Sequence, residues 1–411
     1  MLKLLVVNSL RRKARVSFGS TPRAATLTLC ALRVPKRMRA EQLLRELVAV
    51  PSVNPAFLPP RHRCAGEGRV AELVASQARR AGLEVAFQQV FPGRSNVMAR
   101  LLASGKTRQT VLLAPHLDTV NGTESQFTPV QRAGRCYGRG TCDTKGSVAV
   151  MLAALCQLAR SRRRPTATEI VFAGLNDEEH GQAGSRALAA GGFRADLAIV
   201  GEPTRLKVVT AHKGSLWLRL ETRGKAAHGA CPELGRNAVH VMSRVVDLLE
   251  TRYAAQLRRR RHPLLGHPTA SVGVISGGTQ ANIVPDQCSI LVDRRTLPGE
   301  TNQGVMREIR ALLKAHGLAA TINDGKLAPC VPMETDAGLP LVAQLLRSMG
   351  QARPAGVHYF CDAAVLGAAG IPSVVFGPGD IAQAHTADEW IETRSIQRAE
   401  AMLQTFFQTL P

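Results

Sequence analysis

Short β-type runs alternate with amphipathic stretches from about residue 40 onward, and this alternation limits the fold more than any other feature of the chain. The runs are rich in Val, Leu and Ile, whereas apolar residues in the stretches between them recur at helical spacing. Such alternation is typical of a largely parallel sheet with helices on both faces. It predicts helices at 40–50, 68–81 and 146–159, a strand pair at 84–89 and 95–102, and strands at 110–114, 169–173 and 197–200.

The pattern changes after Pro203 into the order β-α-β-β-α-β, which is that of a ferredoxin-like domain. The elements predicted here are a strand within 207–222, a helix at 237–256, strands at 271–276 and 288–295, a helix at 302–316 and a strand at 319–322. The first pattern then resumes with a helix at 339–348, a strand at 372–376 and a helix from 394.

We therefore predict an α/β protein with a largely parallel central sheet flanked by helices, into which a smaller ferredoxin-like α+β domain is inserted. A length of 411 residues agrees with two domains. We expect residues 39–205 and 320–411 to form the larger domain and residues 206–319 the inserted one.

The formal charge of +22 suggests a polyanion-binding protein, but its distribution weakens that interpretation. Nine basic residues lie within residues 1–38, a segment without Asp or Glu, and subtracting these nine leaves +13 for the remainder. The arginine runs at 160–164 and 258–261 fall at the ends of predicted helices, where cations complement the helix dipole. We expect no nucleic-acid partner, and we expect residues 1–38 to be a disordered extension or the product of a misassigned start.

The spacing of the cysteines and the lengths of the apolar runs indicate the cellular compartment in which the protein acts. The nine cysteines are scattered without paired spacing, which favours free thiols in a reducing, cytoplasmic setting over a disulfide framework or a zinc ribbon. The sequence has no apolar run of the roughly 18 residues that a membrane span requires, so we expect no membrane partner.

Acidic and histidine residues follow the predicted strands or open a helix at five places. Ligands gather at the carboxyl ends of parallel strands, so we expect these residues to converge on one site. They suit Zn²⁺, or Co²⁺ or Mn²⁺ with more oxygen ligands, and one carboxylate must bridge if two ions are bound. The five places are His116 with Asp118, Asp143, Glu178 with Glu179, Glu202, and His385. In an extended backbone Asp118 can accept the second N–H of a metal-bound His116 imidazole.

Seven motifs, in this order, resemble the zinc aminoacylase and carboxypeptidase family (M20 peptidase-like), and within it the acetylornithine deacetylase and succinyl-diaminopimelate desuccinylase branch. They are HLDTV, GRGTCDTKG, NDEEHG, GEPT, GKAAHGACPELGRNAV, GGTQANIVPD and AHTADEW. The resemblance implies an amide hydrolase with two Zn²⁺ per chain, in which Asp143 bridges, His116 and Glu202 complete one site, and Glu179 and His385 complete the other. It further implies that Glu178 is the general base.

The inserted domain supplies further candidates by the same resemblance. It implies that His228 stabilises the oxyanion, often across a dimer interface, and that Asn282 and Arg295 hold the substrate. We therefore expect a homodimer formed through the inserted domain. Arg295 suits a carboxylate because its guanidinium can bind both oxygens. Its neighbour Arg294 is the weaker candidate.

The resulting hypothesis is a metal-dependent amidohydrolase that removes the N-acyl group from a small N-acyl amino acid by attack of a water activated by Glu178. A carboxypeptidase or dipeptidase of the same family, acting on short peptides, is the nearest alternative. A non-catalytic binding protein on the same fold and a polyanion-binding protein are the other two. The preference for one acyl group over another is not readable from the sequence.

Overall fold

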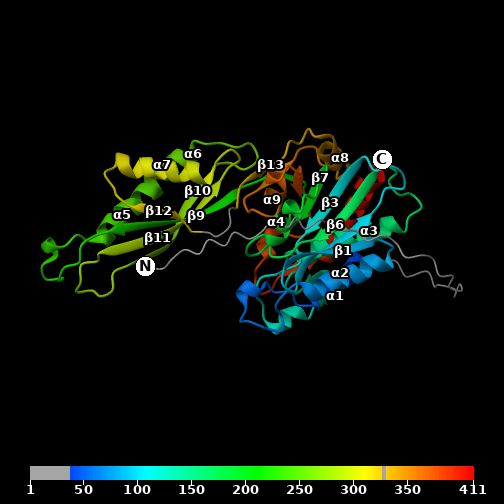
Figure 1. Ribbon diagram of the computed structural model, residues 1–411, viewed down its shortest axis with the longest axis horizontal. Helices are drawn as coiled ribbons and strands as arrows, with labels where there is room; N and C mark the ends of the chain where they lie inside the picture. The colour runs from blue at the N-terminus through cyan, green and yellow to red at the C-terminus, as the bar shows by residue number, and fades with distance from the viewer. Residues whose placement is uncertain (1–37, 326–329) are drawn as a thin grey trace.

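A computed structural model describes residues 38–325 and 330–411, which form two lobes joined side by side (Figure 1). The larger lobe contains a sheet of nine strands and the smaller lobe a sheet of four strands. The predicted extension, residues 1–38, lies outside the described residues except for Met38.

The large sheet has the order β1-β2-β6-β3-β7-β15-β8-β13, with β14 paired to β8. Its strands are β1 (Glu84–Phe91), β2 (Arg94–Leu101), β3 (Gln109–Pro115), β6 (Thr168–Gly174), β7 (Leu197–Gly201), β8 (Val209–His212), β13 (Met333–Glu334), β14 (Ala355–Val357) and β15 (Ser373–Val375). The central strands β6, β3, β7 and β15 are parallel, while β1, β2, β8 and β13 add antiparallel margins.

Helices cover both faces of this sheet. One face packs on α1 (Ala40–Val48), α2 (Gly68–Arg80), α3 (Lys145–Ala159), α8 (Pro340–Ser348) and α10 (Thr393–Thr409). The other packs on α4 (Ala183–Ala190) and α9 (Ala363–Ala368). Successive strand residues alternate between the two cores: Val111 and Leu113 of β3 face the first, Leu112 faces the second. Strands buried on both faces explain the continuous apolar runs of the sequence.

The small sheet has the order β10-β11-β9-β12, and every neighbouring pair is antiparallel. Its elements are β9 (Gly214–Arg223), α5 (Ala238–Leu248), α6 (Ala254–Arg258), β10 (Thr269–Gly277), β11 (Gln287–Thr296), α7 (Asn302–Ala315) and β12 (Thr321–Asp324), with a π-helical turn (Leu249–Tyr253) joining α5 to α6. Residues from α5, α6 and α7 form a separate core with the inward residues of the strands. The predicted fold class is confirmed, including the ferredoxin-like order.

Two details differ from the sequence prediction. The run at 207–222 is not one strand: β8 belongs to the large sheet and β9 to the small one, with Lys213 between them. A third sheet of β4 (Val130–Arg132), β5 (Arg135–Tyr137) and β16 (Trp390–Glu392) was not predicted. The limits of 206–319 for the inserted domain stay a prediction. The strands of the small sheet, from the start of β9 to the end of β12, favour limits of 214–324.

Two further sequence observations can be compared with the structure. The eight cysteines of the described residues are all free, and seven of them are buried. Within residues 38–325 and 330–411, no helix combines the length and the apolar character that crossing a bilayer requires.

Candidate metal centre

Three parallel strands deliver ligand residues to the same sheet edge. β3 ends at Pro115, which pairs with Gly201 at the end of β7, so His116 and Glu202 emerge side by side. His116 also forms a bridge with Leu175, directly after β6, and Glu178 and Glu179 follow in that loop. The convergence predicted from strand ends is therefore present for these four residues.

The bridging candidate Asp143 lies between two imidazoles. Its Oδ1 is 3.0 Å from His116 Nε2, and its Oδ2 is 3.4 Å from His385 Nε2. The His116 Nε2 atom is 3.8 Å from Glu202 Oε1, while His385 Nε2 is 3.1 Å from Glu179 Oε2. Each oxygen of one carboxylate thus faces a different group of ligands, which is the arrangement that two neighbouring cations need.

Two overlapping sets of ligand atoms are close enough to hold an ion. The nitrogen and oxygen atoms of His116, Asp143 and Glu179 lie within 4.8 Å of one another, as do those of His116, Glu178 and Glu202. Glu178, predicted as the base and not as a ligand, therefore lies within reach of the metal position beside Glu202.

The electrostatics of the donor set fit divalent cations. Burial, followed by repulsion from Glu202, raises the pKa of Glu178 well above its usual value, and burial likewise raises the pKa of Glu202 and Glu179. Hydrogen bonds to Asp143 and Glu179 raise the pKa of His385 to about 10. Carboxylates crowded in a buried site are stabilised in their charged form by positive charge placed between them. Two imidazoles and four carboxylates suit zinc.

Asp118 lies directly beneath the ligands and is fully buried. Its carboxylate accepts hydrogen bonds from the backbone N–H of Glu178 and of Glu179, both at 3.1 Å, and from Asn54 Nδ2 at 2.8 Å. His116 Nδ1 is 3.4 Å from this carboxylate and 3.0 Å from the Asp118 carbonyl oxygen. His116 Nδ1 therefore lies near both the carboxylate and the carbonyl oxygen of Asp118, whereas only the carboxylate was predicted as its partner. The Asp118 carboxylate also holds the loop that carries Glu178 and Glu179.

Several residues that support the ligands were not found by sequence reasoning. Buried Glu67 pairs with Arg94, which also reaches Asp177, and Asp177 accepts a hydrogen bond from Asn54. Buried Glu389 contacts the loop that carries Asp143. Glu389 lies within the AHTADEW motif, four residues after His385. Nothing in that spacing marks it as an acceptor of backbone N–H groups.

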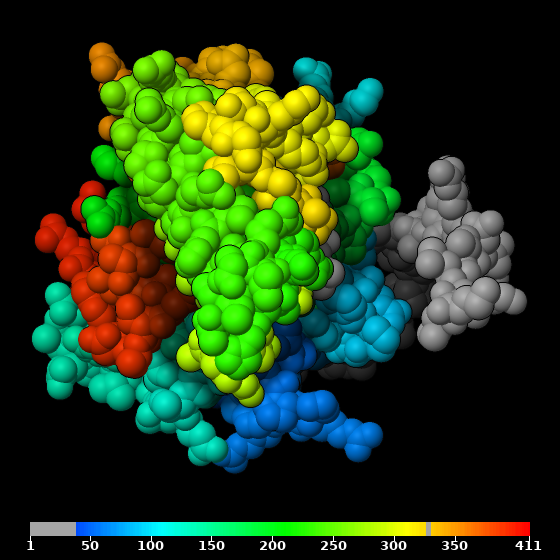
Figure 2. All heavy atoms as spheres, turned by 90° about the vertical axis from the view of Figure 1, so that its left-hand side faces the viewer, coloured from blue at the N-terminus to red at the C-terminus, as the bar shows by residue number. Residues whose placement is uncertain are grey.

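The candidates from the small sheet are not joined to this cluster. His228 forms a bridge with Ile283, and Gly229 N donates to the Asn282 carbonyl at 2.7 Å, so His228 and Asn282 lie on adjacent exposed loops. Within the described residues, no hydrogen bond or ion pair connects either of them to the five ligand candidates. In Figure 2 the small lobe faces the viewer, in front of the large lobe.

The adjacent arginines of β11 have different partners. Arg295 forms an ion pair with Asp293 at 2.9 Å and remains partly exposed. Arg294 is fully buried, where its guanidinium contacts the Tyr253 hydroxyl and Glu300. Arg294 is therefore a structural residue of the small lobe, in line with its lower rank as a candidate.

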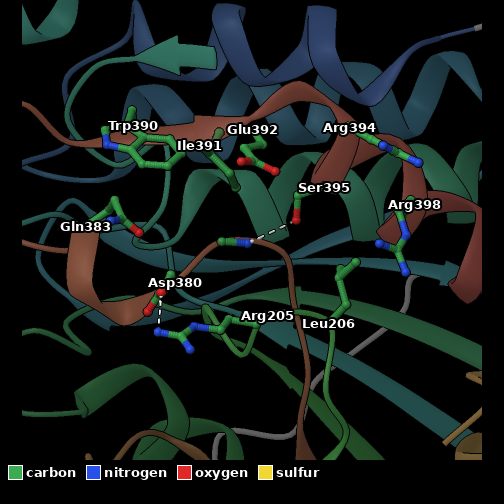
Figure 3. A pocket seen from close by; sticks show the side chains of 11 residues that line it. Arg205, Leu206, Asp380, Gln383, Trp390, Ile391, Glu392, Arg394, Ser395 and Arg398 are labelled. Carbon is green, nitrogen blue, oxygen red and sulfur yellow. Dashed lines mark hydrogen bonds and ion pairs between the residues drawn. The ribbon is translucent and has the colours of Figure 1, made fainter. Parts of the chain in front are cut away.

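A cavity of about 470 Å³ is lined by residues that follow Glu202 or flank His385 in the sequence, but by none of the ligand candidates themselves (Figure 3). Arg205, three residues after Glu202, points toward Asp380 and forms an ion pair with it, and both residues line this cavity. Gln383 and Trp390 come from the two ends of the segment that carries His385. The cavity thus borders the loops that carry the ligands and is not the reaction site.

Comparisons with known proteins agree with this geometry. Residues 112–409 match the description "Peptidase family M20/M25/M40". The chain belongs to this family. It is 30% identical over 375 residues to an acetylornithine deacetylase of Proteus mirabilis, covering 88% of this chain and 94% of that protein. It is 34% identical over 318 residues to an acetylornithine deacetylase of Myxococcus xanthus, covering 75% and 82%.

Solved structures share the fold. The aminopeptidase PepT of Bacillus cereus gives a TM-score of 0.72 at 22% identity and covers 91% of this chain and 98% of its own. A Bacillus subtilis protein described as a dinuclear metal-binding peptidase from the M20 family gives 0.66 at 14% identity, with coverages of 90% and 96%. Membership of the family makes this chain a metal-dependent amide hydrolase, as the motifs indicated.

Proposed function

We propose that the protein hydrolyses the amide bond of a small N-acyl amino acid and releases the free amine. The observation that carries the proposal is the position of Asp143, whose two carboxylate oxygens face His116 and His385 respectively. The named relatives from Proteus mirabilis and Myxococcus xanthus, both acetylornithine deacetylases, support an acyl amino acid as substrate.

The proposed metal centre holds two Zn²⁺ ions, for which Co²⁺ or Mn²⁺ can substitute. His116 and Glu202 would hold one ion, Glu179 and His385 the other, and Asp143 both. When bound, such a pair of cations polarises the amide carbonyl and lowers the pKa of a water molecule. The mixture of imidazole and carboxylate donors supports this assignment, since zinc accepts both.

Glu178 is the proposed general base. Its carboxylate takes a proton from the attacking water and later donates it to the nitrogen of the leaving amine. The raised pKa of Glu178 reflects burial beside Glu202, and positive charge at the site would keep the carboxylate ionised. Asp118 holds the backbone N–H of Glu178 and thereby fixes where the base lies.

The inserted domain is proposed to contribute the oxyanion donor, His228, and the substrate contacts Asn282 and Arg295. Strand β10 is an edge of the small sheet, and its residues Val274 and Ile275 are 52% and 57% exposed. An exposed apolar edge strand favours pairing with a second chain. We propose a homodimer formed through this domain, in which His228 reaches a metal centre. The free, mostly buried cysteines support a cytoplasmic location.

A peptidase of the same family is the second candidate, supported by the likeness of the fold to the aminopeptidase PepT of Bacillus cereus. A panel of acetyl, succinyl and longer acyl amino acids, tested beside dipeptides on the zinc-loaded protein, separates the two. Hydrolysis of the acyl amino acids supports the deacylase. Turnover of dipeptides alone would replace it with the peptidase.

Glu178→Gln tests the mechanism. It should keep the zinc content and lower kcat by about 10²–10⁴-fold, the usual contribution of a general acid or base. The matched control is Glu233→Gln, the same change at an exposed position of the small lobe. A Glu178→Gln protein that keeps both ions and turns over at the normal rate would remove Glu178 from the mechanism.

A further inference from the structure

Glu389 is a buried carboxylate that joins two ligand-bearing segments of the chain. It lies four residues after His385, immediately before β16, and is 1% exposed. Its partners all come from the Gly-rich turn before α3, where Asp143 lies. A buried acid in a protein rich in arginine usually pairs with one cation, but here most of the partners are backbone N–H groups.

Both oxygens of Glu389 are fully used. Oε1 accepts the N–H of Cys142 at 2.8 Å and of Asp143 at 3.0 Å. Oε2 accepts the N–H of Gly140 at 3.0 Å and the Arg139 guanidinium at 2.7 Å. All four hydrogen bonds have the Glu389 carboxylate as acceptor, and hydrogen bonds to an ionised carboxylate are of the stronger, charge-assisted kind.

The turn that Glu389 contacts is only partly held by hydrogen bonds of its own, from Thr141 N to the Gly138 carbonyl and from Lys145 N to the Gly140 carbonyl. Gly140 has φ +82°, and a Cβ there would lie 2.8 Å from the Thr119 side chain, so the backbone must be free of a side chain. The Thr144 side chain makes no capping hydrogen bond at the start of α3. Three other N–H groups of this turn, those of Gly140, Cys142 and Asp143, are satisfied by Glu389, which therefore contributes to the orientation of Asp143.

The same residue anchors the segment of His385. Gly138 N donates to the Glu389 carbonyl at 2.9 Å, and Gln126 Nε2 donates to the Ala387 carbonyl at 2.9 Å. The His385 side chain is 52% exposed, whereas that of His116 is 1% exposed. His116 directly follows strand β3 and is buried, whereas His385 lies on a partly exposed loop that these contacts help to hold.

We propose that Glu389 is a positioning residue that fixes His385 relative to Asp143, so that the metal held by Glu179 and His385 depends on it more than the metal held by His116 and Glu202 does. This inference rests on the metal centre proposed above. It differs from a general stabilising role because it predicts unequal effects on two neighbouring ions.

The test is Glu389→Gln, which keeps the size of the side chain but turns one oxygen into an amide NH₂ that faces N–H groups. Asp388→Asn is the matched control, because this neighbour is exposed and has no hydrogen-bond or ion-pair partner among the described residues. Zinc and cobalt affinities are measured for each of the two ions by titration of the metal-free proteins, together with the visible absorption of bound Co²⁺. Loss of an outer contact to a metal ligand typically weakens affinity about 10–100-fold.

The expected result is that Glu389→Gln loses about 10–100-fold in affinity for the ion of Glu179 and His385 and clearly less for the other ion, with the larger change in one of two cobalt signals, while Asp388→Asn matches the unmodified protein. The proposal would be overturned if Glu389→Gln left the affinities for both ions unchanged, or if it lowered both affinities by the same factor. If the unmodified protein binds fewer than two ions, the metal centre itself is wrong, which is a separate failure. Should Glu389→Gln not fold, Gln126→Ala removes a contact to the same segment and must weaken binding of the ion of Glu179 and His385 more than binding of the other ion.

Discussion

Replacing Asp118 by Asn is expected to damage catalysis without altering any proposed ligand. The Asp118 carboxylate accepts three hydrogen bonds, from Glu178 N, Glu179 N and Asn54 Nδ2, and faces His116 Nδ1. In Asn one of the two oxygens becomes an NH₂ group. Whichever way the amide turns, its NH₂ group opposes a backbone N–H, of Glu178 or of Glu179, that has no other acceptor among the described residues.

The expected loss of activity in Asp118→Asn follows from the hydrogen bonds that the substitution removes. A buried donor without an acceptor costs about 1–3 kcal/mol. The strain can be relieved only by moving the loop that carries the base and one ligand. Loss of such an outer partner typically lowers activity about 10–100-fold, which corresponds to about 1.4–2.7 kcal/mol of transition-state stabilisation. We therefore expect kcat/KM of Asp118→Asn to fall within that range.

The assay is steady-state hydrolysis of an N-acetyl amino acid at saturating zinc, with the zinc content of each sample measured. Asp247→Asn serves as control, because it is the same change on the exposed side of α5. A fall in kcat with both zinc ions still bound would show that the position of Glu178 is what changed. An Asp118→Asn protein with normal kcat/KM would refute the role given to these hydrogen bonds.

Further predictions address the metal, the inserted domain and the charge. Removal of metal with a chelator should abolish hydrolysis, and added Zn²⁺ should restore it. His228→Ala should lower kcat about 10²–10³-fold, as for an oxyanion donor, with unchanged zinc content. Arg294→Ala should destabilise the protein by about 1–3 kcal/mol in denaturant titrations, since it removes a buried guanidinium that contacts the Tyr253 hydroxyl and Glu300, whereas Arg295→Ala should raise KM and leave stability unchanged. A protein of residues 38–411 should show no salt-sensitive binding of DNA; retained binding would revive the polyanion alternative.

The fold was largely predictable because its central strands are buried on both faces. Burial of this kind leaves continuous apolar runs, and these runs marked β3, β6 and β7 correctly. The division at Lys213 was missed, because a single residue separates β8 from β9 and the partner sheet of each is set by pairing with residues far away in sequence. Strand pairing of that kind leaves no local signal in a single sequence.

The ligands were predictable for a similar reason, and their supports were not. A residue directly after a parallel strand has its place in the fold fixed by that strand, so His116 and Glu202 could be located from the sequence alone. Glu389 and Asn54 act by binding groups on loops whose path is known only from the structure. Sequence reasoning found the atoms that would touch metal and missed the carboxylate that aligns them.

The unequal exposure of the two imidazoles indicates how the substrate must approach. The side chains of His116 and Glu202 are at most 5% exposed, while that of His385 is 52% exposed. Among the ligand candidates, His385 therefore marks the side from which a substrate can reach the centre. Because His228 makes no contact with the cluster within one chain, we infer that it must be brought to that same side, either by movement of the small lobe or by a second copy. Mixing two inactive proteins, Glu178→Gln and His228→Ala, decides between these routes. Exchange of subunits restores activity only if His228 acts across the dimer.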